Sequence, residues 1–182
     1  MVERRTKAAL TPRARKNRTA RPREHGRWFV LRVILLTGRG EELADPPGRD
    51  LLIHDGHTFE AIARAIDRSF ARWDLSHLHE FALLDGRRIA MEDAEEFGEI
   101  TSERPLDERL HTLTSVGLGV GQTFQYVFDF GDGWEHRCTV LRDDIDPVAE
   151  CGSVPNEIVP IFGWGTIPDQ YGRSSAAQDE TE

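Results

Sequence analysis

Residues 124–141 read FQYVFDFGDGWEHRCTVL, and this stretch contributes most to the expected fold. Aromatic residues alternate with other residues before its centre, DFGDGW, and the alternation resumes after it, which predicts two antiparallel strands joined by a tight turn. Gly131 and Gly133 suit the positive φ angles of such turns. Because two aspartates, a glutamate and a histidine surround these glycines, DFGDGWEH is also a candidate site.

Two registers are compatible with this turn. A two-residue loop of Asp132 and Gly133 would place Asp129 opposite His136, so that a carboxylate and an imidazole are cross-strand neighbours. A three-residue loop, 131–133, would pair Phe130 with Trp134, Phe128 with His136, Tyr126 with Cys138 and Phe124 with Val140. We favour the three-residue loop, because it gathers the aromatics and His136 on one buried face. It leaves Asp129 on the other face, near Glu135 and Arg137.

The segments upstream supply the rest of the fold. Residues 28–37 are apolar and β-branched and predict a strand, whereas residues 38–50 are expected to form a loop. Thr58 is expected to cap a helix that runs to about Trp73, since apolar residues recur there every three or four positions. Asp85 and Gly86 predict a second hairpin. The sequence therefore predicts an α+β fold, a small roll-like domain with a mostly antiparallel sheet and one main helix packed on it.

The remaining segments are less regular. Residues 92–99 are an acidic run, and residues 106–113 are expected to form one or two helical turns. A loop follows Leu141, and residues 155–173 contain so much Pro and Gly that we expect an extended strap packed on the domain. The predicted organisation is a basic disordered tail at 1–27, a domain at 28–172 and an acidic disordered tail at 173–182.

Charge divides the chain sharply. Ten Lys or Arg against two Glu give residues 1–27 a formal charge of +8, so the rest carries −17 within a total of −9. Such an arm binds phosphate backbones without sequence preference, and Arg13, Arg15, Lys16 and Arg18 are the candidate nucleic-acid contacts. A tail that only aids solubility is the alternative. The longest apolar run is too short to cross a bilayer, and no secretory signal is present, so we expect a cytoplasmic protein without a membrane partner.

The histidines of the SHLHEF segment suggest another kind of site. On a strand, His77 and His79 would share one face, and two imidazoles at this spacing are half of a metal site. Further ligands would come from Asp74, Asp129, Asp132 or His136. The candidate set for a divalent metal is therefore His77, His79, Asp129 and His136, and partly exposed sheet histidines are the alternative.

Two segments resemble the plasmid pRiA4b ORF-3-like family. FQYVFDFGDGWEH resembles the hallmark Y-x-Y-D-F-G-D-x-W-x-H, and FARWDLSHLHEFAL resembles G-W-x-x-x-H-L-H-x-F. The resemblance covers Trp28 to Arg142, with Arg72 standing where a glycine is expected and FGWGTIPDQYGR replacing the usual family ending. It implies a small α+β roll-like domain and an association with plasmids and transposons. The hallmark positions imply a candidate binding surface of Trp73, Asp129, Asp132, Trp134 and His136.

Three functions follow as hypotheses. The first is a non-catalytic binding or accessory module of mobile elements, whose aromatic and acidic hairpin surface recognises an unidentified protein or ligand. The second is a metal-dependent, hydrolase-like enzyme that uses His77, His79, Asp129, Asp132 and His136. The third is a nucleic-acid-associated protein that binds through its basic arm.

Overall fold

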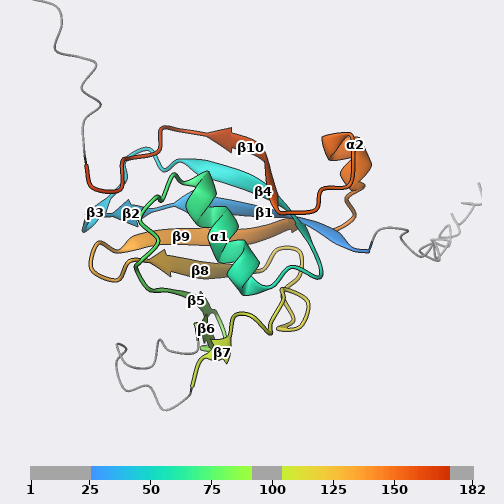
Figure 1. Cartoon of the computed structure of the whole chain (residues 1–182), viewed down its shortest axis with the longest axis horizontal. Coiled ribbons are helices and arrows are strands. Elements are labelled where there is room, and N and C mark those ends of the chain that lie inside the picture. Colours follow the sequence, from blue (N-terminus) through green and yellow to red (C-terminus); the bar gives the residue numbers. More distant parts are fainter. Residues whose placement is uncertain (1–25, 92–103, 173–182) are drawn as a thin grey trace, which may run out of the picture.

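The computed structural model describes residues 26–91 and 104–172 of the chain. A single eight-stranded sheet, in the order β10-β4-β1-β9-β8-β5-β6-β7, forms its centre, and helix α1 crosses one face (Figure 1). Neighbouring strands of this sheet are antiparallel except β6 and β7. This is the α+β fold that the sequence predicts. The elements are β1 (Trp28–Leu35), β2 (Thr37–Gly38), β3 (Glu41–Glu42), β4 (Gly48–His54), α1 (Phe59–Ser69), β5 (His79–Leu83), β6 (Arg88–Ala90), β7 (Leu106–Asp107), β8 (Thr123–Phe128), β9 (Trp134–Arg142), α2 (Pro147–Cys151) and β10 (Val159–Trp164).

Helix α1 begins where the sequence predicts. The hydroxyl of Thr58 accepts a hydrogen bond from the backbone N–H of Ala61, which satisfies one of the free donors of the first turn. The apolar stripe at positions 59, 62, 66 and 70 is fully buried against the sheet. The helix ends earlier than expected, because Ala71 turns the chain with a φ of 53°. Trp73 therefore lies outside the helix and is exposed, which corrects its placement on the buried stripe.

The β8–β9 hairpin has the predicted faces and a different register. Strand β8 ends at Phe128 and β9 begins at Trp134, so the loop spans residues 129–133. The observed pairs are Phe128 with Trp134, Tyr126 with His136 and Phe124 with Cys138. This differs by two residues from the predicted three-residue loop, and Asp129 does not pair with His136 as in the two-residue alternative. Because an even shift preserves the faces, His136 still lies among aromatic residues, whereas Phe130 moves into the loop and becomes exposed.

Several segments are more regular than the sequence suggests. Residues 48–50, expected in a loop, belong to β4, and residues 159–164 of the expected strap form the edge strand β10, which pairs with β4. Pro160 is tolerated there because β10 lies at the edge of the sheet. The expected loop after Leu141 contains α2, capped by Asp146. Residues 106–113, expected to be helical, contain β7 followed by turns.

Strand β1 is buried on both faces. Its odd-numbered residues join the main core under α1, and Trp28 and Val30 form a smaller cluster with Leu52 and Ile145 on the opposite face. Arg32, which interrupts the apolar run of the sequence, bonds Asp50 on β4 through two 2.8 Å hydrogen bonds. In the sheet these two residues are direct cross-strand partners, so the charge is neutralised where it is partly buried.

Some predictions fall outside the described residues. These are most of the basic arm, including Arg13, Arg15, Lys16 and Arg18, the acidic run at 92–99 and the segment 173–182. Arg27, at the end of the predicted arm, forms an ion pair with Asp143, and its backbone carbonyl accepts a hydrogen bond from Asp55. In residues 26–91 and 104–172 no helix is long and apolar enough to cross a membrane.

Candidate functional site: an acidic and aromatic surface beside the hairpin

Asp129 is the first residue of the loop between β8 and β9, and its side chain bonds to the backbone of that loop. This residue has a φ of 57°, and its Oδ1 accepts hydrogen bonds from the backbone N–H groups of Gly131 at 3.1 Å and Asp132 at 3.4 Å. Its carbonyl oxygen accepts a third, from Gly133, at 2.7 Å. Aspartate tolerates this conformation better than most residues, because its short carboxylate can bond to the loop's own backbone. The second oxygen, Oδ2, is directed to His77, 3.4 Å from its Nδ1.

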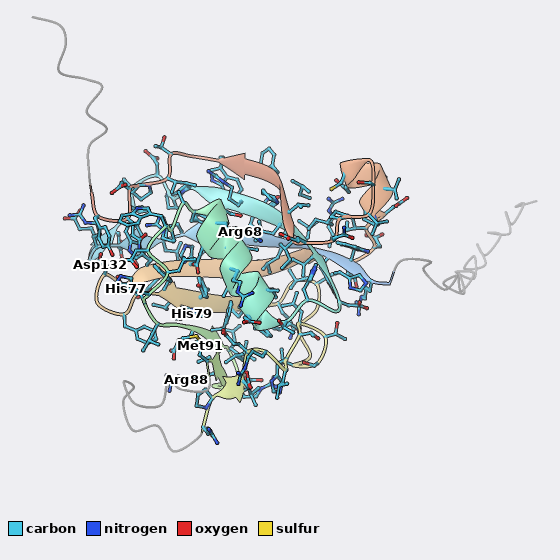
Figure 2. The ribbon with its side chains drawn as sticks, in the orientation of Figure 1. Arg68, His77, His79, Arg88, Met91 and Asp132 are labelled. Carbon is cyan, nitrogen blue, oxygen red and sulfur yellow. The ribbon has the colours of Figure 1, made fainter. Side chains whose placement is uncertain are left out.

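His77 lies between two carboxylates. Its Nε2 is 3.7 Å from Oδ2 of Asp74, opposite the contact with Asp129. The hydroxyl of Tyr171 is 3.1 Å from the same Nε2 and donates a hydrogen bond to Asp74 at 2.7 Å. Residues far apart in the chain therefore meet at one end of the sheet, where Figure 2 shows His77 and Asp132 close to the β8–β9 loop.

Exposed aromatic side chains surround these polar groups. Trp73 is 52% exposed and packs edge-on against Tyr171, with 5.1 Å between the ring centroids. Tyr171 is 39% exposed, and Phe130, which follows Asp129 in the loop, is 44% exposed. Neighbouring exposed aromatic side chains such as Trp73 and Tyr171 are a feature of interaction surfaces. We call this set the acidic-aromatic surface: Trp73, Asp74, His77, Asp129, Phe130 and Tyr171.

A buried glutamine holds one side of this surface in place. Gln170 is inaccessible to solvent, and its Oε1 accepts hydrogen bonds from the backbone N–H groups of Trp73 at 2.9 Å and Asp74 at 3.1 Å. Its Nε2 donates to the carbonyl oxygen of Asp74 at 3.0 Å. The loop after α1 is thereby fixed to the C-terminal strap, which is the kind of support that a preorganised site needs.

The surface carries negative charge at neutral pH. Hydrogen bonds from Ser76 and Tyr171 lower the pKa of Asp74 to about 2, so its carboxylate stays ionised. The hydrogen bond to Asp74 in turn raises the pKa of Tyr171 to about 12, with further contributions from the charges of Asp129 and Asp132. Ionised carboxylates beside aromatic rings are the groups that bind guanidinium and ammonium ions.

A second polar group lies beneath α1 and is buried. Nε2 of His79 is 2.7 Å from Oε2 of Glu108, and the hydroxyl of Tyr126 donates to Oδ1 of Asp67 at 2.9 Å. The rings of His79 and Tyr126 are 5.6 Å apart, which joins the two pairs. Burial raises the pKa of Asp67 to about 6, although the hydrogen bond from Tyr126 and the charge of His79 oppose the shift. These hydrogen bonds satisfy the buried polar groups of the network.

Trp134 and His136 belong to the core. Trp134 is buried, and the guanidinium of Arg72 lies 3.7 Å above its ring. His136 is inaccessible, and its burial, assisted by the charge of Arg72, lowers its pKa to about 3. Within the described residues Nε and Nη1 of Arg72, Nε1 of Trp134 and Nε2 of His136 have no hydrogen-bond partner. Because buried polar atoms are rarely unpaired, internal water is expected here.

The candidate residues therefore divide into two places. Trp73 and Asp129 belong to the acidic-aromatic surface, with Asp132 in the adjoining loop, while Trp134 and His136 are in the core. His77 lies before β5 and contacts the ring of Phe128, with Asp74 and Asp129 near its ring nitrogens. His79 is the first residue of β5, contacts the ring of Tyr126 and is hydrogen-bonded to Glu108. In residues 26–91 and 104–172 no three His, Cys, Asp or Glu side chains are arranged to hold a metal ion.

Sequence reasoning missed several of these residues. Asp67 lies on the buried stripe of α1, and a polar residue at a core position of an amphipathic helix is a signal that could have identified it. Glu108 contacts His79 across 29 residues of chain, and Tyr171 contacts His77 across 94 residues. No local sequence pattern indicates either partner. Arg72 was noted only as a departure from the family pattern.

A family model, a partly matching relative and a solved structure resemble this chain. The family model described as "Plasmid pRiA4b ORF-3-like protein" matches residues 41–153. The uncharacterised protein y4hQ of Sinorhizobium fredii (strain NBRC 101917 / NGR234) is 39% identical over 71 residues, which are 38% of this chain and 34% of that relative. The match thus spans about a third of the relative's length.

A solved structure has the same fold. The protein of unknown function MM3350 from Methanosarcina mazei Go1 superposes with a TM-score of 0.57 at 17% identity, over 75% of this chain and 69% of that one. At this identity the likeness concerns the fold alone. The family match covers more than half of the 182 residues and includes both hallmark segments. The chain belongs to the plasmid pRiA4b ORF-3-like protein family.

Proposed function

We propose that the protein is a non-catalytic binding module that recognises a cationic segment of a partner polypeptide through the acidic-aromatic surface. The observation that carries the proposal is the exposure of Trp73 and Tyr171 in edge-on contact beside the ionised carboxylate of Asp74. An arginine or lysine side chain would place its charge beside the carboxylates of Asp74 and Asp129, next to His77, and its alkyl stem on the rings.

Three features support this assignment over a simple polar surface. The carboxylates are fixed before a ligand arrives, that of Asp74 by hydrogen bonds from Ser76 and Tyr171 and that of Asp129 by the backbone of its own loop. His77 contacts both carboxylates, so the two acceptors lie close enough together to serve one cationic segment. The chain outside its basic arm carries a large negative charge, which attracts a cationic partner over a longer range. The plasmid origin in the family description supports an accessory role in a mobile element.

The test is binding of a tetra-arginine peptide by isothermal titration calorimetry at moderate salt. Asp129→Asn keeps the loop hydrogen bonds, because asparagine also accepts through Oδ1 and tolerates a positive φ. We expect it to weaken binding about tenfold, which corresponds to about 1.4 kcal/mol. Trp73→Leu should weaken binding by a similar factor through loss of the cation–π contact.

A matched control separates recognition from bulk charge. Asp85→Asn removes one carboxylate from the β5–β6 hairpin, where Asp85 is bonded to Arg87. It changes the net charge as Asp129→Asn does, so equal loss of affinity in the two variants would show that the peptide binds by charge alone. A tetra-glutamate peptide should not bind.

A metal-dependent function stays a prediction from the sequence, and within residues 26–91 and 104–172 no set of three possible ligands favours it. The measurement is the metal content of tag-free protein by mass spectrometry, with His77→Ala and His79→Ala variants alongside. Stoichiometric metal that is lost in a variant would favour the enzyme hypothesis over the binding module.

Nucleic-acid binding through the basic arm remains a separate prediction, because the arm lies outside the described residues. Binding should fall steeply with salt and disappear when residues 1–25 are deleted. Arg27 is kept in this deletion, since it is paired with Asp143 on the folded domain. Binding that survives the deletion would contradict this hypothesis.

A further inference from the structure

A groove of about 370 Å³ lies between helix α1 and the segment that leads into β10. Its apolar lining comes from Ala61, Leu75 and Ile158, and its basic lining comes from Arg64 and Arg68. Leu75 is 55% exposed, so an apolar side chain at the groove is left in water. A volume of this size suits a small molecule, and an apolar lining with a few polar groups is typical of ligand sites.

The two arginines are available to a ligand. They are one helical turn apart on α1, where Figure 2 labels Arg68, and the side chains of both are exposed. Arg64 is paired with Glu60, and Nη1 of Arg68 is 3.1 Å from Oε2 of Glu157 on the other side of the groove. Exposed ion pairs of this kind contribute at most about 1 kcal/mol, so a ligand anion can replace the glutamates.

His57 fixes one wall of the groove. Its Nδ1 accepts a hydrogen bond from the backbone N–H of His54 at 3.0 Å, and its ring also bonds to the backbone of Asn156. Edge contacts with the rings of Trp28 and His54 hold it further. Desolvation lowers the pKa of His57, so the ring is neutral at neutral pH and the arginines supply the positive charge. His57 is therefore held by several contacts, and the positive charge at the groove comes from Arg64 and Arg68.

We propose that this groove binds a small organic anion, with a carboxylate or phosphate head between Arg64 and Arg68 and a short apolar body on Ala61, Leu75 and Ile158. The volume of about 370 Å³ favours a small molecule over a polypeptide. The charge of the two arginines selects an anion, although the chain as a whole is acidic. The apolar lining excludes a bare inorganic ion as the best ligand. The proposal uses residues outside the acidic-aromatic surface and does not depend on cation recognition there.

The test uses octanoate, octyl phosphate, octanol and inorganic phosphate as probes in calorimetric titrations of the full chain. We expect saturable 1:1 binding of octanoate or octyl phosphate, and the tighter of the two identifies the head group. Octanol lacks the charge and inorganic phosphate lacks the apolar body, so both should bind at least tenfold more weakly. Equal affinity for octanol, or no saturable binding of either anion, would overturn the proposal.

Variants place the ligand in the groove. The double variant Arg64→Gln with Arg68→Gln should weaken octanoate binding at least tenfold. Arg142→Gln, which removes an exposed arginine paired with Glu150, should leave affinity within twofold of the wild type. Ala61→Leu fills part of the groove without changing charge and should also weaken binding. Unchanged affinity in the double variant would contradict the site, provided that circular dichroism shows all variants folded.

Discussion

Replacing Asp67 by asparagine should reduce the loss in the free energy of unfolding that the wild type shows as pH rises. The Asp67 carboxyl is buried beneath α1, and its pKa of about 6 is above the ordinary value of 3.8. The folded state holds the proton of Asp67 more tightly than the unfolded chain does. The contribution of the protonated carboxyl to the free energy of unfolding is therefore fully present below about pH 4 and is lost as pH rises through 6. The shift of about two units corresponds to roughly 3 kcal/mol.

Asparagine at position 67 does not ionise and can still accept the hydrogen bond from Tyr126. The free energy of unfolding should be measured by urea denaturation, followed by tryptophan fluorescence, at several pH values between 4 and 7.5. The difference between Asp67→Asn and the wild type should rise by roughly 3 kcal/mol across this range, in favour of the variant. Because the two proteins share all other titratable groups, the contributions of those groups to stability drop out of this difference.

Asp85→Asn is the matched control. Hydrogen bonds with Arg87 lower the pKa of Asp85 below its ordinary value of 3.8, so its contribution to stability is lost only in more acidic solution. The difference between Asp85→Asn and the wild type should therefore stay nearly constant between pH 4 and 7.5. A difference between Asp67→Asn and the wild type that does not change with pH would refute the reasoning. It would mean that Asp67 ionises in the folded protein as readily as in the unfolded chain.

Three further predictions concern the core. Gly38→Ala should lower the free energy of unfolding by about 1–3 kcal/mol in urea denaturation, because its Cβ would lie 2.2 Å from the ring of Trp134; an unchanged midpoint would contradict this contact. Burial raises the pKa of Cys138, whereas Cys151 is exposed, so a thiol reagent should titrate one cysteine in the native protein and two in urea. The pKa of His136 is lowered to about 3, so its contribution to stability should be lost as pH falls below 6.5, and His136→Phe should reduce this loss; an identical acid transition would exclude His136 as its cause.

The predictable parts of the structure depend on local patterns. The apolar stripe of α1 and the alternation in β8 and β9 identify these elements and their buried faces, because burial selects residues at the period of each element. The length of the β8–β9 loop does not follow from this rule, since loops of three and five residues give the same faces. Asp129 decides between them by bonding to its own loop, which keeps it out of the strand.

The candidate site was predictable only in part. Trp73 and Asp129 were identified through the hallmark segments, and His77 was assigned to a metal site instead. The partners that define their environment, Gln170 and Tyr171, come from the Pro- and Gly-rich strap about a hundred residues later. Contacts of this kind depend on how β10 pairs with β4. No regular spacing of apolar residues in the sequence indicates that pairing.

The most direct test of cation recognition is to follow the indole N–H signals of the four tryptophans by NMR while tetra-arginine is added. Trp73 is exposed on the acidic-aromatic surface, whereas Trp28 and Trp134 are buried in the core. The signal of Trp73 should shift in a saturable way, the signals of Trp28 and Trp134 should stay, and Asp129→Asn should reduce the shift of Trp73 at a given peptide concentration. A Trp73 signal that does not move while the peptide binds would contradict the proposed function.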